Sequence, residues 1–418
     1  MRDALARSAV STVMSRGVRR GRIDVIEGNR RRGFGPADAE LRATVTINDP
    51  AAWRGPLHGS RGLGEGYVDG LWETDDLVSL IRIAAREVGT LDGIRGAVAK
   101  PRALLHRARR LVPENTRVGA RQNISAHYDL GNDLFAAFLD ERMMYSCAYF
   151  PSPGASLEEA QVAKLDRICT QLRLGPDNHL LEIGTGWGGL AVHAAHGYGC
   201  RVTTTTISRE QHALATQRVR DAGLEDRVTV LLEDYRDLRG SYDRLVSIEM
   251  IEAVGWRHFG TFFAKCSELL APDGAMLLQA ITIDDRAYEV EKASKSFINT
   301  HIFPGGCLPS LEVIVRNVAR RTDLQAVGLE DLTPHYVETL RRWCKTFTAH
   351  APALAELGYD ERFRRLWTLY LAYCEAGFAE RRICDVQLLL TKPRSRITSR
   401  TYRTGSGHSQ QPELSLSA

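Results

Sequence analysis

The residues best suited to chemistry are an acid and a set of glycines that lie close together in one short segment. Glu182 falls in an apolar run that starts at His179, and glycines follow at positions 184, 186, 188 and 189. A helical pattern from Leu190 to Ala195 comes next, so the expected order is strand, tight turn and helix. Glycines let the backbone approach a ligand and leave helix N–H groups directed at it. The segment therefore predicts a site for a cofactor that contains a nucleoside.

Two cofactor fingerprints share this spacing. Gly184, Gly186 and Gly189 fit a dinucleotide site, whereas Glu182 with Gly184, Gly186 and Gly188 fits a site for S-adenosylmethionine (SAM), in which the acid faces the amino-acid part of the cofactor. A dinucleotide site also needs an acid at the end of the next strand. That strand, 201–207, is followed by Ser-Arg. The pattern therefore favours SAM, with a glycine turn that only packs as the structural alternative.

Composition sets wider limits on the class of protein. The 418 residues indicate two domains, or one large domain with an appendage, and 44% hydrophobic and 25% charged residues are typical of a globular protein. The sequence has no apolar run of the ~18 residues that span a membrane, and the N-terminal residues lack the apolar core of a secretory signal. The eight cysteines are scattered without Cys-x-x-Cys pairs, which predicts a reduced intracellular protein with no bound metal.

Positive charge is concentrated in three stretches although the net charge is only +4. Residues 1–32 hold nine Arg against three acids, residues 100–121 hold seven Lys or Arg against one acid, and residues 392–403 hold five and no acid. These stretches lack the interleaved aromatics of nucleic-acid-binding segments, whereas apolar and basic residues alternate at helical spacing in 102–111, as in helices that lie on anionic membranes. We expect a cytoplasmic protein held at the inner face of the cell membrane, with no nucleic-acid partner.

Most of the chain alternates short apolar runs with amphipathic stretches. Strands are expected at 179–183, 201–206, 228–232, 243–248 and 275–283, with a tight turn at 272–274 and helices that include 164–174 and 209–222. This alternation predicts an α/β fold with a doubly wound, mostly parallel sheet and a cofactor at the carboxyl ends of its strands.

The remaining segments are expected to flank this core. Residues 1–95 predict a small α+β domain with a strand at 41–47, a turn at 62–67 and a helix at 75–85. Residues 96–122 form a basic connector to a catalytic domain at 123–394, in which 330–390 are expected to be helical and to cover the site. The tail, 395–418, has a composition typical of disorder.

Nine motifs in order resemble the cyclopropane-fatty-acid synthase family, which includes the mycolic acid methyltransferases. They lie at 62–67, 127–133, 145–149, 182–189, 206–211, 243–255, 302–309, 335–336 and 373–377. The resemblance implies a class I SAM-dependent methyltransferase with a helical lid and an N-terminal domain that handles lipid or forms a homodimer contact. Its implied reaction is the addition of a carbon from SAM to the cis double bond of an unsaturated acyl chain in membrane phospholipid.

The resemblance also assigns individual residues. It places SAM against Tyr128, Tyr145, Ser146, Glu182, Gly184, Gly186, Thr206, Gln211, Asp234 and Tyr235. It places a bicarbonate or carbonate ion, the implied base, among Cys147, Glu252, Tyr336 and the backbone of Ile281. Aromatic faces can stabilise the carbocation that methylation creates, and Tyr149, Phe150, Phe303 and Tyr336 are the candidates.

Two positions depart from the commonest pattern of the family. Ala253 and Gln279 stand where histidines are usual, and Gln279 can donate a hydrogen bond to an anion but cannot carry its proton. This variant resembles the plant-type cyclopropane synthases and, more closely, the actinobacterial enzymes that make 10-methylene precursors of acids such as tuberculostearic acid. A 10-methylene product, which needs a separate reductase, is thus expected, with a cyclopropane as the alternative. A SAM-dependent enzyme with a non-lipid substrate and a catalytically dead lipid-binding protein are further alternatives.

Overall fold

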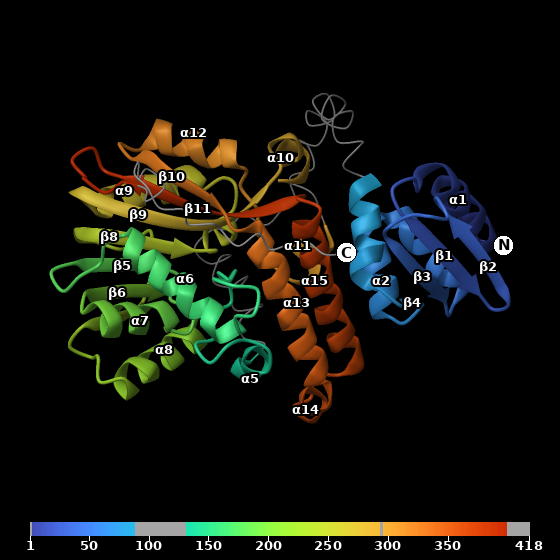
Figure 1. Cartoon of the computed structure of the whole chain (residues 1–418), viewed down its shortest axis with the longest axis horizontal. Helices are drawn as coiled ribbons and strands as arrows, with labels where there is room; N and C mark the ends of the chain where they lie inside the picture. Colours follow the sequence, from blue (N-terminus) through green and yellow to red (C-terminus); the bar gives the residue numbers. More distant parts are fainter. Residues whose placement is uncertain (1, 88–130, 293–295, 399–418) are drawn as a thin grey trace.

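The computed structural model describes residues 2–87, 131–292 and 296–398. Its centre is a seven-stranded sheet (Figure 1). In spatial order the strands are β10 (Gln325–Asp331), β11 (Ile383–Thr391), β9 (Leu270–Ile283), β8 (Tyr242–Ile248), β5 (His179–Ile183), β6 (Arg201–Thr206) and β7 (Val228–Leu232). The strands from β9 to β7 are parallel, whereas β11 runs antiparallel to both of its neighbours. The predicted doubly wound, mostly parallel sheet is confirmed.

Alternating side chains of the strands face two layers of helices. Leu180 packs in a cluster with α6 (Leu157–Gln171), α7 (Gly189–Tyr198) and α8 (Arg209–Asp221). Its neighbour Leu181 packs on the opposite face with α9 (Phe259–Leu269) and α12 (Leu311–Arg321). Because successive side chains of a strand point to opposite faces, both layers bury apolar residues of one strand. The chain order reverses between β5 and β8, and this switch point is where such sheets bind ligands.

A second, smaller sheet forms the N-terminal unit. Its order is β2 (Arg30–Phe34), β1 (Arg22–Glu27), β3 (Arg42–Ile47) and β4 (Trp72–Thr74). The helices α1 (Arg2–Gly17), η1 (Pro50–His58) and α2 (Gly59–Val68) accompany it, and residues 77–87 are also helical. The predicted strand at 41–47 corresponds to β3.

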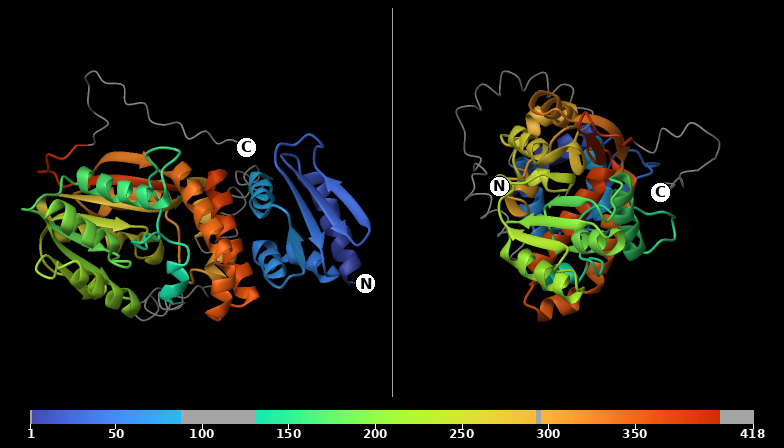
Figure 2. Two further views of the ribbon diagram at one scale, coloured as in Figure 1. Left: turned by 60° about the horizontal axis from the view of Figure 1, so that its bottom comes forward. Right: turned by 90° about the vertical axis from the view of Figure 1, so that its left-hand side faces the viewer.

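Long helices lie between the two sheets in Figure 1 and in the left view of Figure 2. They are α13 (Thr333–Ala349) and α15 (Glu361–Ala379), with the short α14 (Ala351–Glu356) joining them. Arg365 of α15 donates to the carbonyl oxygens of Tyr67 and Trp72, and Glu380 forms ion pairs with Arg82 and Arg86. These contacts fix the N-terminal unit against the helices. The shorter helices α5 (Asn132–Ala136), η2 (Ile251–Ala253), α10 (Asp285–Glu291) and α11 (Phe297–His301) complete the described elements.

Three local predictions were wrong. Residues 62–67 lie inside helix α2 because their glycines allow close packing: a Cβ at Gly64 would lie 2.6 Å from Phe297. Residues 383–391 form β11 rather than helix, since this apolar run pairs with β9 along nine residues. The expected turn at 272–274 lies within β9 as a register irregularity.

Candidate active site

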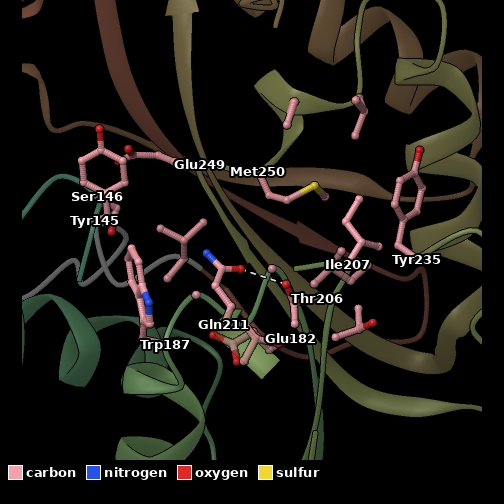
Figure 3. A pocket seen from close by; sticks show the side chains of 18 of the residues that line it. Tyr145, Ser146, Glu182, Trp187, Thr206, Ile207, Gln211, Tyr235, Glu249 and Met250 are labelled. Carbon is pink, nitrogen blue, oxygen red and sulfur yellow. Dashed lines mark hydrogen bonds between the residues drawn. The ribbon is translucent and has the colours of Figure 1, made fainter. Parts of the chain in front are cut away.

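A cavity opens at the carboxyl ends of β5, β6 and β8 (Figure 3). The glycine turn forms one wall, with φ values of 103° at Gly184, 52° at Gly186 and 87° at Gly188, which L-residues with side chains rarely adopt. A Cβ at Gly184 would lie 3.2 Å from the side chain of Met250 across the cavity. The turn leads into the N-terminus of α7, whose N–H groups favour a negatively charged or polar ligand.

Glu182 lies at the base of this turn with only 4% of its surface exposed. Its Oε2 accepts a 2.6 Å hydrogen bond from Oγ1 of Thr204, and that hydroxyl pairs with Thr185 at 2.7 Å. Burial raises the pKa of Glu182 to about 8. A buried acid with few donors around it is suited to receive a cationic group, such as the ammonium of an amino acid.

Six further residues expected to contact the cofactor line the same cavity. Thr206 donates to Gln211 at 2.8 Å, the contact drawn in Figure 3. Asp234 accepts from two nitrogens of Arg236, at 2.8 and 2.5 Å. Figure 3 places Tyr235 at one end and Tyr145 and Ser146 at the other. Tyr128 lies outside the described residues, as do the connector 96–122 and most of the tail.

The residues assigned to an anion converge on a carboxylate of the protein itself. The Cys147 N–H donates to Oε1 of Glu249 at 2.8 Å, and Nε2 of Gln279 donates to the same oxygen at 2.9 Å. The hydroxyl of Tyr336 donates to Oε2 of Glu249 at 2.6 Å. Glu249 also lines the cavity, beside Tyr145 and Ser146 in Figure 3. Sequence reasoning missed this residue, although it lies in the same motif as Glu252.

Glu252 and Asp385 flank Glu249. The N–H of Ile281 donates to Oε1 of Glu252 at 2.6 Å, while Oε2 is buried and has no hydrogen-bond partner in the described chain. Gln279 donates a second bond, at 2.9 Å, to Oδ2 of Asp385, which is fully buried. Burial and mutual repulsion raise the pKa of Glu252 to about 8 and that of Asp385 well above its usual range.

Lys164 is the buried cation of this region. It is fully buried in α6, and its Nζ donates to Oγ of Ser146 at 2.6 Å. Burial lowers the pKa of Lys164, while the charges of Glu249 and Asp385 oppose that shift. Together with Glu249, Glu252 and Asp385 it forms the group that we call the acid cluster. Because the cluster holds three carboxyl groups and only one lysine, it can carry a net negative charge.

Aromatic rings surround the acid cluster. Tyr336 stacks on Phe378 with ring centroids 4.3 Å apart, and the hydroxyl of Tyr145 bonds that of Tyr370 at 2.8 Å. Phe303 packs edge-on against Tyr370. By contrast, the rings of Tyr149 and Phe150 are covered by Arg167 and Arg342 and do not line the cavity. Of the aromatic candidates, Tyr336 contacts the acid cluster directly through its bond to Glu249, whereas Phe303 packs on Tyr370.

A doubly wound sheet with a glycine turn and a buried acid at its switch point defines a class I SAM-dependent methyltransferase. The family model described as mycolic acid cyclopropane synthetase matches residues 115–388. Solved structures agree: the cyclopropane synthase MmaA2 from Mycobacterium tuberculosis matches with a TM-score of 0.61 and 32% identity, over 68% of this chain and all of that one. The mycolic acid cyclopropane synthase CmaA1, complexed with SAH and CTAB, matches with the same score and identity over 65% of this chain and 98% of that one.

The sequence is also similar to that of two named enzymes over most of its length. The chain is 43% identical over 337 residues to the tuberculostearic acid methyltransferase UfaA1 of Mycobacterium tuberculosis, covering 79% of this chain and 78% of that protein. It is 40% identical over 367 residues to the cyclopropane-fatty-acyl-phospholipid synthase of Escherichia coli K12, covering 85% and 87%. The chain belongs to the mycolic acid cyclopropane synthetase family and is a SAM-dependent methyltransferase.

Proposed function

We propose that this enzyme methylates the cis double bond of an unsaturated acyl chain in membrane phospholipid and forms a 10-methylene product. The observation that carries the proposal is the acid cluster, which reaches the SAM cavity through Glu249 and contacts the stacked rings of Tyr336 and Phe378. A reaction that passes through a carbocation needs a dry site, negative charge and a base. The cluster and its aromatic wall supply these conditions.

The cavity residues would hold the cofactor as the family pattern assigns. Glu182 would receive its ammonium group, the turn at Gly184 and Gly186 would lie against it, and Gln211, Asp234 and Tyr235 would bind the rest. Bound SAM supplies an electrophilic methyl group. The chain's own residues then have to orient the acyl chain, exclude water and accept the proton that the methylated chain must lose.

A bicarbonate ion does not fit the donor set of this chain. The donors assigned to it are already engaged: the Tyr336 hydroxyl bonds Glu249 at 2.6 Å and the Ile281 N–H bonds Glu252 at 2.6 Å. Cys147, the further residue assigned to surround it, donates its N–H to Glu249 at 2.8 Å. An added anion would also lie next to carboxyl groups. The protein's own carboxyl groups therefore take the place of bicarbonate in the proposed mechanism. Glu252 instead holds the N–H of Ile281 and, with its raised pKa, stores a proton beside Glu249.

Two products follow from the same cation. Loss of a proton from the added methyl closes a cyclopropane, whereas a hydride shift before that loss leaves an exocyclic methylene. The match to a tuberculostearic acid methyltransferase over more than three quarters of both chains supports the methylene product. The match to a cyclopropane-fatty-acyl-phospholipid synthase supports the alternative. A separate reductase would complete a 10-methyl branch.

Basic and apolar surface supports a peripheral position on an anionic membrane at the inner face of the cell. Helix α1 exposes Leu5 and Val13 between arginines, at 66% and 70%. Trp256 is exposed, with Arg257 and Lys292 over its ring. Among the described residues no helix is long and apolar enough to cross a membrane. The N-terminal unit would contact lipid or a second copy of the chain.

The test is incubation of purified enzyme with labelled SAM and vesicles of oleoyl phospholipid, followed by mass spectrometry and NMR of the released acyl chains. An exocyclic methylene is the expected signal, and a cyclopropane would select the alternative product. Bound SAM without transfer to any acyl chain would overturn the lipid proposal, leaving a non-lipid substrate or a dead lipid-binding homologue. Vesicles of fully saturated phospholipid are the matched control and should receive no label.

A further inference from the structure

The carboxylate of Glu249 takes the hydrogen bonds that the family pattern assigns to a separate anion. Cys147 N–H and Tyr336 O–H each carry one hydrogen, and each donates to Glu249. The two hydrogens of the Gln279 amide match its two acceptors, Glu249 and Asp385, while its oxygen accepts from Gln387 at 3.0 Å. Ile281 N–H donates to Glu252. Protein carboxyl groups therefore engage each of these donors.

The backbone of Glu249 directs its side chain into this position. Its φ is 47°, in the left-handed region that non-glycine residues rarely adopt. A 2.9 Å bond from its N–H to the carbonyl oxygen of Gln279 holds that conformation at the end of β8. Unfavourable backbone of this kind is common at functional sites, where the surrounding structure maintains it. Here it brings the carboxylate to the wall of the SAM cavity.

The hydrogen bonds also decide which member of the acid cluster is ionised. Donors stabilise the charged form of a carboxyl group. Glu249 accepts three hydrogen bonds, from Cys147, Gln279 and Tyr336. Asp385 accepts from Gln279 and the Cys147 thiol, and Glu252 accepts from the N–H of Ile281. Burial raises the pKa of Glu249, and its donors and the charge of Lys164 oppose the rise. Glu249 is thus the group best able to remain a carboxylate while its neighbours hold protons.

We propose that the Glu249 carboxylate is the catalytic base of this enzyme and replaces the bicarbonate ion of the family pattern. The alkene electron pair forms the new C–CH3 bond as the S–CH3 bond breaks, and a hydride shift moves the positive charge to the carbon that bears the methyl. A methyl C–H bond then breaks, its electron pair forms the C=CH2 bond, and the proton passes to Glu249. The proton returns to solvent when the product leaves. The substrate in this step rests on the proposed function, but the occupation of the anion site by Glu249 does not.

The first experiment needs no lipid. Carbon-13 bicarbonate is titrated by NMR into the full-length enzyme and into Glu249→Gly, with SAM present. Glycine suits φ 47°, so this variant relieves the backbone while it removes the carboxylate. We expect saturable bicarbonate binding in the variant and none in the parent enzyme. Saturable binding in the parent at millimolar bicarbonate would overturn the proposal.

The second experiment measures turnover on oleoyl vesicles in CO2-depleted buffer. The parent enzyme should be as active there as with added bicarbonate. Glu249→Gln should lose about 100-fold or more in kcat, the usual contribution of a general base, while its SAM affinity changes by less than about threefold. Glu249→Gly should fall similarly and regain about 10-fold with bicarbonate, because the opened site accepts an external base.

Glu225→Gln is the matched control, since Glu225 is an exposed acid that pairs with Arg220 on the surface. It should retain the parent kcat. A parent enzyme that requires bicarbonate, or a Glu249→Gln variant with parent-like turnover, would show that Glu249 is not the base. If the parent does not methylate the vesicles at all, the proposed substrate fails, and the bicarbonate titration still decides whether Glu249 fills the anion site.

Discussion

Both ends of the cavity contain buried acidic side chains, but the number of protein donors that bond these acids differs between the two ends. At the cofactor end Glu182 accepts one hydroxyl bond at 2.6 Å and lies at the base of the glycine turn. At the other end lies the acid cluster, in which amide and hydroxyl donors of the protein engage both oxygens of Glu249 and one oxygen each of Glu252 and Asp385. The first end leaves its acid available for an incoming cation. The second end already provides its central carboxylate, Glu249, with three donors from the protein.

This difference separates binding from chemistry. A site that must hold a whole cofactor keeps space and an incompletely satisfied acid, because the ligand supplies the missing partners. A site that must receive a proton needs its base fixed in place before the substrate arrives. Changes at the cofactor end should therefore alter SAM affinity, and changes in the acid cluster should alter turnover.

Of the changes at the cofactor end, Gly184→Ala should weaken SAM binding most strongly. Its φ of 103° and a Cβ 3.2 Å from Met250 make any side chain unfavourable there. Strain of ~2–3 kcal/mol in the turn predicts a loss of about 30- to 150-fold in SAM affinity, measured by calorimetry. Gly197→Ala in α7 is the control, because nothing lies within 4 Å of its added Cβ. Equal SAM affinity in both variants would contradict the role of the turn.

Glu252→Gln tests the acid cluster with a smaller change. Glutamine keeps an oxygen for the N–H of Ile281 but cannot exchange a proton with Glu249. We expect kcat to fall about 10-fold, less than for Glu249→Gln, with SAM affinity changed by less than about twofold. Single-turnover kinetics would separate the chemical step from SAM binding. A parallel loss of turnover and SAM affinity would remove the distinction between the two ends.

The cofactor end could be predicted because its residues are neighbours in the sequence. Glu182, the glycines and the start of α7 follow one another, and β6 with Thr206 comes next along the chain. The strand and helix pattern of the doubly wound core was visible for the same reason: each element is a continuous run with its own period.

The acid cluster could be predicted only in part because it is assembled from distant segments. Glu249 meets Cys147 from 102 residues away and Tyr336 from 87. The family pattern indicated the donors but not what they would bond. Asp385 was missed because β11 was expected to be helix, and its strand character comes from pairing with β9 about 100 residues earlier. The helix at 62–67 was missed because its glycines are explained by neighbours that the local pattern does not show, such as Phe297 against Gly64 and Trp72 against Gly66.

The smallest expected effect concerns stability rather than activity. Burial raises the pKa of Glu182 to about 8 from its ordinary value of 4.5, so the folded protein holds a proton there that the unfolded chain releases. The stability that this proton provides is present below pH 4.5 and is lost as pH rises toward 8. Glu182→Gln is neutral at every pH and still accepts from Thr204. In SAM-free enzyme its Tm should equal that of the parent near pH 5 and exceed it by about 2–5 °C near pH 9.

Differential scanning calorimetry would measure this, with Glu225→Gln as a control that shows no such trend. A Tm difference that does not grow with pH would mean that Glu182 is ionised in the folded enzyme, and that the cofactor end resembles the acid cluster more closely than its hydrogen bonds indicate.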